Sequence, residues 1–165
     1  MSMPPLPLIL DDASLKISTD DTAANLAELA CVTTHIELAP STTVTTVDTM
    51  CGSTDYAGVT KWTLTVTLVQ SFDTGATEEI LSGAIAHGGP VAFEVMGYRT
   101  KPVSATNPAW SGLVDPQPYP PINGDAGAAS EMQLAWGVVG TPVKSIVPGA
   151  GTMSASARTA EPAAA

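Results

Sequence analysis

The chain has 165 residues, enough for one domain with a real core and too few for two generous ones. Charged residues make up only 13% of it, against roughly one quarter in ordinary globular domains, and the formal net charge is −10. Nucleic-acid binding needs clustered Lys and Arg, so this balance excludes a protein that grips nucleic acid, although an acidic wall leaves a passing polyanion mobile. The scarcity of charge favours burial of surface in repeated subunit contacts.

Residues 1–13 are expected to form an extended N-terminal arm, because the prolines at positions 4, 5 and 7 oppose a helix. This start lacks the basic and apolar parts of a signal peptide, and no segment approaches the roughly 18 apolar residues of a membrane span. We therefore expect a soluble protein made in the cytoplasm, with no membrane partner. Residues 14–18 suit a short strand, and an aspartate near position 20 suits the cap of one helical turn.

The clearest pattern lies in residues 60–70, where large apolar side chains alternate with threonines. A period of two places these sets on opposite faces of a strand, one for the core and one wet but nearly uncharged. Residues 31–38 repeat the pattern and are expected to end at Pro40, in the same antiparallel sheet. The polar faces of the two segments comprise Thr33, His35 and Glu37, and Thr63, Thr65 and Thr67.

Residues 40–59 separate these two strands, a span too long for a tight hairpin turn. They include strand-forming residues with no obvious local partner. We interpret them as an arm stabilised by a neighbouring molecule, with Val44, Val47, Met50 and Tyr56 as the inter-subunit contacts.

Residues 77–87 are the one good helix candidate, with Thr77 as the cap, two glutamates in the first turn and Gly88 just beyond the end. Residues 91–98 predict a third strand, with Glu94 on its polar face. Residues 101–129 are rich in proline and glycine and predict a long surface loop. Residues 130–139 predict a fourth strand, residues 143–147 a short edge strand, and residues 149–165 a disordered tail.

No catalytic, cofactor-binding or metal-binding signature is present, so the sequence predicts a protein that is not an enzyme. His35 and His87 lack a nucleophile or ligand spacing. Cys31 and Cys51 are expected to be reduced and at least partly buried, with a bridge as the less favoured alternative. Trp110 is either an anchor for its loop or a platform for a sugar.

Residues 62–71, followed by a short helix and residues 91–95, resemble the central sheet of the major tail tube proteins of long-tailed (siphovirus-type) bacteriophages. Two motifs are similar to those of phages of actinobacteria: Asn-Pro-Ala-Trp-Ser-Gly at 107–112 and Ala-Trp-Gly-Val-Val-Gly-Thr-Pro at 135–142. Gly137 departs from a proline that is frequent in this family, and Trp110 stands where phenylalanine is common. The resemblance spans roughly residues 30–147.

This resemblance implies a mainly β fold, a tail-tube-type β-sandwich or partial barrel over residues 14–148 with one short flanking helix. It implies hexameric rings that stack into a tube in the virion tail, assembled in the cytoplasm of a bacterial host. Tape-measure and tail-terminator or tail-tip proteins would be partners, and double-stranded DNA would pass through without specific binding. The polar strand faces above, together with Glu94, would line the lumen.

Two other classes of function stay open on the sequence alone. One is a head decoration protein or other virion surface protein, which is also β-rich, acidic and non-enzymatic. The other is an extracellular carbohydrate-binding β-sandwich that uses Trp110, although the lack of an export signal disfavours it.

Overall fold

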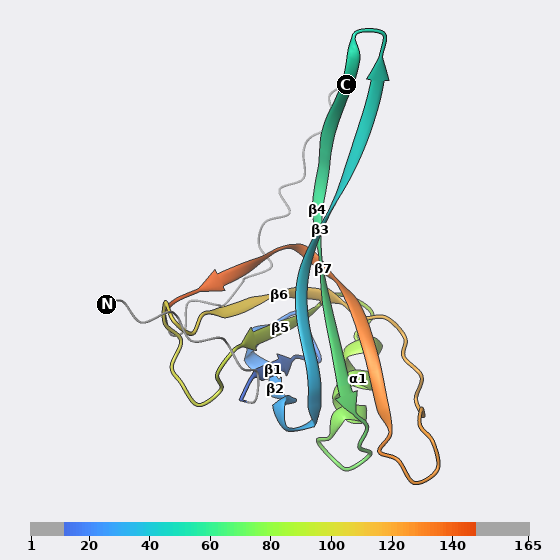
Figure 1. Cartoon of the computed structure of the whole chain (residues 1–165). Helices are drawn as coiled ribbons and strands as arrows, with labels where there is room; N and C mark the ends of the chain where they lie inside the picture. Colours follow the sequence, from blue (N-terminus) through green and yellow to red (C-terminus); the bar gives the residue numbers. More distant parts are fainter. Residues whose placement is uncertain (1–11, 148–165) are drawn as a thin grey trace, which may run out of the picture.

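A computed structural model describes residues 12–147 of the chain, so most of the predicted N-terminal arm and all of the predicted 149–165 tail lie outside it. Its seven strands form one antiparallel sheet, in the order β2-β1-β5-β6-β7-β4-β3, with β2 and β3 at the two edges (Figure 1). The strands are β1 (Ser14–Ile17), β2 (Ala27–Glu28), β3 (Thr33–Thr49), β4 (Gly52–Val69), β5 (Val91–Met96), β6 (Ala109–Asp115) and β7 (Glu131–Ser145). The helix is α1 (Thr77–Ala86), and single 3-10 turns span Ala23–Asn25 and Ala30–Val32.

The core lies on one face of the sheet, where the predicted alternation of β4 is confirmed. Leu64, Val66 and Leu68 are at most 1% exposed, and the threonines between them point to the other face. The cluster is completed by Leu15, Ile17, Leu29, Ile80, Leu81, Ala84, Val91, Phe93, Val114, Met132, Leu134 and Trp136. Every strand from β1 to β7 except the edge strands β2 and β3 places fully buried residues in this cluster.

The sheet curls so that side chains of strands that are not direct neighbours meet on the inner face. The rings of Trp62 in β4 and Trp110 in β6 lie 6.2 Å apart, although β7 separates these strands in the sheet. The predicted mainly β class with one helix is confirmed. The strands form one curved, open sheet.

Helix α1 follows β4 and precedes β5 along the chain, as predicted, and it packs on the inner face of the sheet. Its first turn carries Glu78 and Glu79, which suit the positive end of the helix dipole. The predicted cap is wrong by one residue: Ala76 is the N-cap, and the buried Thr77 hydroxyl donates to the Val69 carbonyl. The backbone N–H of Gly75 is satisfied by the Glu79 carboxylate at 2.6 Å.

Strands β3 and β4 are much longer than predicted, because the segment between them is itself a β-hairpin. We call residues 41–60 the arm; it projects away from the body of the fold (Figure 1). The strands pair with each other out to Thr49 and Gly52, so Met50 and Cys51 form a tight turn, contrary to the expectation that this span is too long for one. At about 3.3 Å per residue the arm extends roughly 30 Å.

Pro40 does not end β3, contrary to expectation. It pairs with Trp62 in the middle of the hairpin. Because β3 is an edge strand, a residue without an N–H is tolerated where its nitrogen faces the unpaired side.

Residues 101–129 are also not one long loop. Residues 109–115 form β6, a central strand between β5 and β7, so Trp110 belongs to the sheet. The predicted edge strand at 143–147 is instead the end of β7, which bends at Gly140 (φ 77°) and continues beside β6. The segment between β6 and β7 packs on the helix, where the Tyr119 hydroxyl donates to the Glu78 carboxylate at 2.8 Å. Burial of Tyr119 and this hydrogen bond raise the pKa of its hydroxyl.

The base of the arm depends on Gly58, which gives a first prediction. A β-bulge there sets two residues of β4 against Thr43, and a Cβ on Gly58 would lie 2.9 Å from the Thr43 carbonyl oxygen. In Gly58→Ala we expect hydrogen exchange of the arm amides to accelerate about tenfold, because local opening costs less. The melting temperature of the body should stay unchanged, since the arm holds no core residue.

Ser53→Ala is the matched control, because Ser53 lies in the exposed part of the same strand without such a contact. Equal exchange rates in the two variants would contradict this role of Gly58.

Candidate functional site

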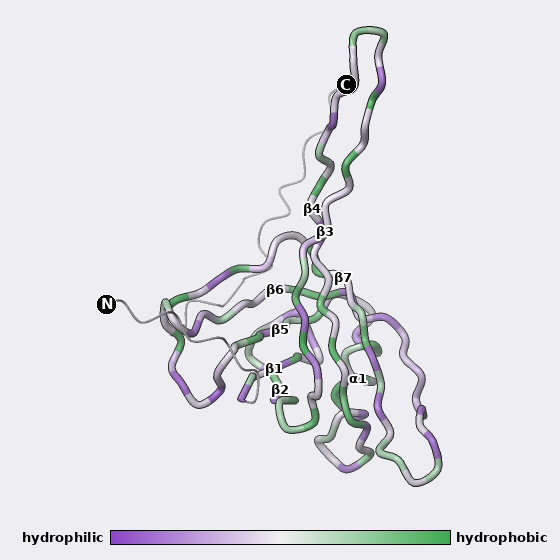
Figure 2. The backbone as a smooth tube through the Cα atoms, in the orientation of Figure 1, coloured by the Kyte–Doolittle hydropathy of each residue, from purple (hydrophilic) through white to green (hydrophobic). Residues whose placement is uncertain are grey.

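The arm exposes apolar side chains that nothing in the described part of the chain covers. All residues from 40 to 61 are exposed, and Figure 2 shows apolar positions interspersed with polar ones along the hairpin. The exposed fractions are 58% for Val44, 43% for Val47, 108% for Met50, 59% for Tyr56 and 82% for Val59. An isolated two-stranded hairpin is marginally stable in water, so this surface is suited to being covered by a partner.

The predicted contact residues divide between the two faces of the arm. Residues directly opposite in an antiparallel pair share a face, so Val44 lies with Ala57. Val47 and Tyr56 lie on the other face, two register positions apart. Both faces of the arm therefore carry apolar groups, as expected of an element inserted between surfaces.

The outer face of the sheet is rich in hydroxyl groups where β3, β4 and β7 run side by side. The register places His35 opposite Thr67 and Glu37 opposite Thr65. On the other side of β4, the three threonines lie opposite residues of β7 that are small or uncharged. We call this surface the hydroxyl face; it consists of His35, Glu37, Thr63, Thr65, Thr67, Gln133, Ala135 and Gly137.

Two residues predicted for this face lie elsewhere. A bulge between Thr33 and His35 reverses the alternation, so Thr33 lies opposite the buried Leu68 and donates to the Leu29 carbonyl at 2.6 Å. Glu94 is on β5, with β6 and β7 between it and β4, and its carboxylate is 2.8 Å from Lys16 Nζ. The structure thus brings together five of the seven predicted residues.

A cavity of about 340 Å³ opens where the free edge strand β3 faces the ends of β5 and β6. We call it the seam pocket. Ile36 and Leu38 form one wall, and Val95 and Trp110 lie on the other. Its remaining lining residues are Ala13, Met96, Gly97, Tyr98, Thr106, Asn107 and Pro108. The size falls at the lower end of the range of about 300–1,000 Å³ that is usual for ligand pockets.

The loop along one side of the seam pocket is held by Asn107, which is 2% exposed. Its side-chain amide donates to the carbonyls of Tyr98 at 2.9 Å and Lys101 at 3.0 Å, and its oxygen accepts from the Tyr98 N–H at 3.1 Å. In the same motif, a Cβ on Gly112 would lie 3.1 Å from the Phe93 ring. The motif that begins at Asn107 thus shapes this loop and the packing beside it.

A second anchor ties the start of the described chain to this loop. Thr100 donates to the Asp12 carboxylate from both its backbone N–H and its hydroxyl. These bonds, and then the nearby charge of Arg99, hold the pKa of Asp12 below its ordinary value. Asp12 also lies 3.6 Å from Arg99 Nε.

Two lysines stack over aromatic residues that line the seam pocket, and we call their side of the pocket its rim. Lys101 Nζ lies 3.7 Å from the centroid of the Tyr98 ring, and Lys144 Nζ lies 5.6 Å from that of Trp110. With Arg99, three of the five Lys and Arg residues between positions 12 and 147 lie here. Sequence reasoning missed this cluster, because its members come from a loop and from β7.

The two cysteines are free and exposed, so the expectation of burial is wrong. Cys51 is at the tip of the arm, while Cys31 precedes β3 and accepts from Arg99 Nη1 at 3.3 Å. The length of β3 at about 3.3 Å per residue separates them by roughly 55 Å, which excludes a bridge within one chain.

Within residues 12–147, no three His, Cys, Asp or Glu side chains come together as a metal-binding group. His35 lies on the hydroxyl face and His87 at the end of α1. No helix in the same part of the chain is long and apolar enough to cross a bilayer.

The anchoring role of Asn107 yields a second prediction. Asn107→Ala removes three part-buried hydrogen bonds made by a buried side chain, so we expect the free energy of unfolding in urea to fall by about 2–4 kcal/mol. Asn123→Ala is the control, because Asn123 is exposed and donates one side-chain bond, to the Glu131 carbonyl at 3.0 Å. A loss no greater than in the control would contradict the role of Asn107.

No family model matches the chain, and no curated protein sequence matches it. Solved structures do match: a chain of the "Virion of native gene transfer agent (GTA) particle" superposes with a TM-score of 0.57. The match covers 81% of this chain and 95% of that chain, at 13% sequence identity. The chain therefore shares its fold with a component of a virion particle.

Proposed function

We propose that this chain is a structural virion protein: a major tail tube subunit that assembles into stacked hexameric rings around a channel for DNA. The arm carries the proposal. It is a long hairpin with exposed apolar residues on both faces and no core beneath it. In a monomer such an element exposes apolar side chains to water, and in a polymer neighbouring copies can bury them. The shared fold with a chain of a gene transfer agent virion supports the same class of function.

The open sheet supports assembly by a second route. Strand β3 pairs only with β4, and β2 only with β1, so each edge has unpaired backbone groups within the described chain. Edge groups that pair with another copy gain hydrogen bonds and lose their tendency to aggregate. Six copies joined through such edges form a ring.

The hydroxyl face suits the wall of the channel. It offers threonine hydroxyls, an amide and the carboxylate of Glu37, and the same face continues to one cation, Lys61, at the base of the arm and to a second carboxylate, Glu131, at the other end. DNA binding depends on cations that replace counterions, so DNA slides past this surface without adhering. Tape-measure and tail-terminator or tail-tip proteins are the further partners that this proposal requires, and the virion tail is the location.

The sugar-binding alternative loses its main support. Trp110 is not in an exposed loop: it lies in β6, next to Trp62 and beneath Lys144. A head decoration protein remains the competing structural role; such a protein binds capsids and does not form tubes.

Removal of the arm tests the proposal. In a variant that lacks residues 44–57, Thr43, Gly58 and Val59 form the new turn beyond the Thr42–Thr60 pair, and the core is untouched. We expect this variant to sediment as a folded monomer under conditions where the intact chain forms rings or tubes, because the arm supplies contacts between copies. Ser53→Ala, which keeps the arm, should assemble normally. Equal assembly of the shortened and intact chains would refute this function of the arm.

Added positive charge tests the lumen assignment. Glu37→Lys with Thr63→Lys and Thr65→Lys should permit tubes, because long side chains can extend into the channel, but should slow DNA release from particles. A control with the same added charge places lysines at Thr74, Ser82 and Asp125, which are exposed away from this face. If both variants release DNA at the same rate, the hydroxyl face does not line the channel.

A further inference from the structure

The seam pocket is an apolar cavity with a charged rim, so its shape and its charge together constrain what can fill it. Its walls are mainly aliphatic and aromatic, and about 340 Å³ accommodates only a few apolar side chains. Ile36 and Leu38 are partly buried and pack at the border of the core. A partner that inserts here must be narrow and apolar at its end.

The rim favours a negatively charged partner. Lys101 and Lys144 lie over the two aromatic rings of the pocket, and their ammonium groups remain exposed. Arg99 adds a third cation, partly offset by Asp12. In a chain of net charge −10, this is an unusual concentration of positive charge.

The tip of the arm has the complementary properties. Residues 41–60 contain no Lys or Arg, and their two carboxylates, Asp48 and Asp55, lie on one face of the hairpin. At the end is Met50, fully exposed on a two-residue turn. Methionine adapts its shape to irregular gaps, and its sulfur makes favourable contacts with aromatic rings.

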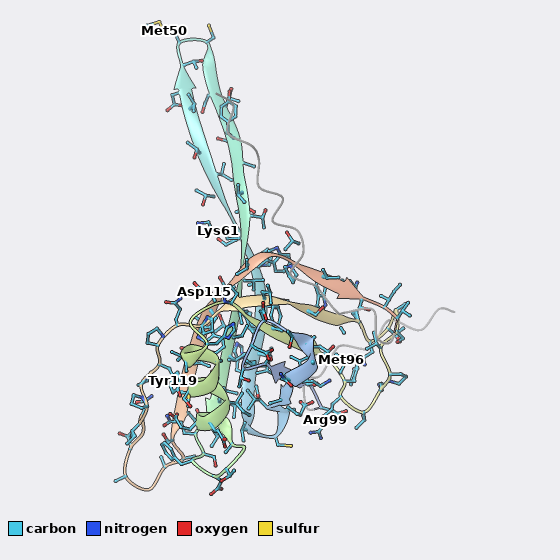
Figure 3. All side chains as sticks on the ribbon, turned by 180° about the vertical axis from the view of Figure 1, so that it is seen from behind. Met50, Lys61, Met96, Arg99, Asp115 and Tyr119 are labelled. Carbon is cyan, nitrogen blue, oxygen red and sulfur yellow. The ribbon has the colours of Figure 1, made fainter. Side chains whose placement is uncertain are left out.

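The tip that enters the pocket must come from another molecule. Met50 lies at the far end of the arm, and Met96 and Arg99 lie on the body, well away from it (Figure 3). The hairpin is paired along its whole length and cannot fold back.

We propose that the arm tip of one copy docks in the seam pocket of a second copy, with Met50 among the aromatic side chains and Asp48 and Asp55 near the rim lysines. This inference rests on the proposed self-assembly and names the surface that receives the arm. It also explains why the basic residues are concentrated at this place.

Cross-linking tests the contact directly, because the native Cys51 lies next to Met50. In a Cys31→Ser chain, Thr106→Cys places a second thiol on the exposed rim of the pocket. Copper phenanthroline with oxygen removes two electrons and two protons from a thiol pair to form a disulfide. In assembled protein we expect the intermolecular link between positions 51 and 106 to exceed, about tenfold, the link from Cys51 to Ser82→Cys on α1.

Charge exchange is the second measurement. Lys101→Glu with Lys144→Glu should raise the concentration needed for assembly about tenfold, and Asp48→Lys with Asp55→Lys in the same chain should restore it. Both rim lysines are exposed, so the fold is expected to persist, and circular dichroism checks this.

The outcomes separate the two proposals. If the intact chain forms no assembly, the proposed function fails. If it assembles but neither the 51–106 link nor the charge effect is seen, the docking inference alone is wrong. A 51–106 link that forms only after residues 1–11 are removed would mean that the chain's own N-terminal segment fills the pocket, which also overturns the inference.

Discussion

Strand β4 connects the two parts of the molecule through one continuous ladder of backbone hydrogen bonds. Its second half pairs with both β3 and β7 and buries Leu64, Val66 and Leu68 in the core. Its first half pairs only with β3 and extends about 30 Å into solvent. Core packing thus fixes where the arm begins and how it is directed, while nothing in the described chain stabilises its end. The arm has a fixed base and an uncovered end, which is the physical basis of the proposed assembly.

The alternation of apolar and polar residues along the strands gives the two faces of the sheet different properties. One face excludes water and receives α1, and the other keeps threonines at half-buried positions beside exposed Glu37 and Gln133. A surface of hydroxyl groups is wet and weakly charged, so it neither collapses onto a neighbour nor binds a polyanion strongly. Of the five Lys and Arg residues between positions 12 and 147, three lie around the seam pocket and one, Lys61, lies at the end of the hydroxyl face. This distribution of charge is consistent with the proposed self-assembly around a channel for DNA.

The sequence predicted the elements whose pattern is regular and missed those that bulges and glycines interrupt. The period-two run at 62–68 and the helix at 77–87 needed no further information. Pro40 was interpreted as the end of a strand, because an edge position that tolerates proline is visible only when the pairing is known. Strand β6 was missed for a similar reason: Asn107, Pro108 and Gly112 resemble loop residues, although they shape a strand and its entry. The seam pocket could not be predicted, because Ile36, Val95 and Trp110 meet only through the curvature of the sheet.

The most direct measurement is cryo-electron microscopy of the purified full-length chain under conditions that favour assembly. The account predicts hollow tubes of stacked six-fold rings, with Thr63 and Thr65 facing the channel and each arm in contact with another copy. Solitary particles, or tubes in which the arms touch nothing and the threonines face outward, would contradict it.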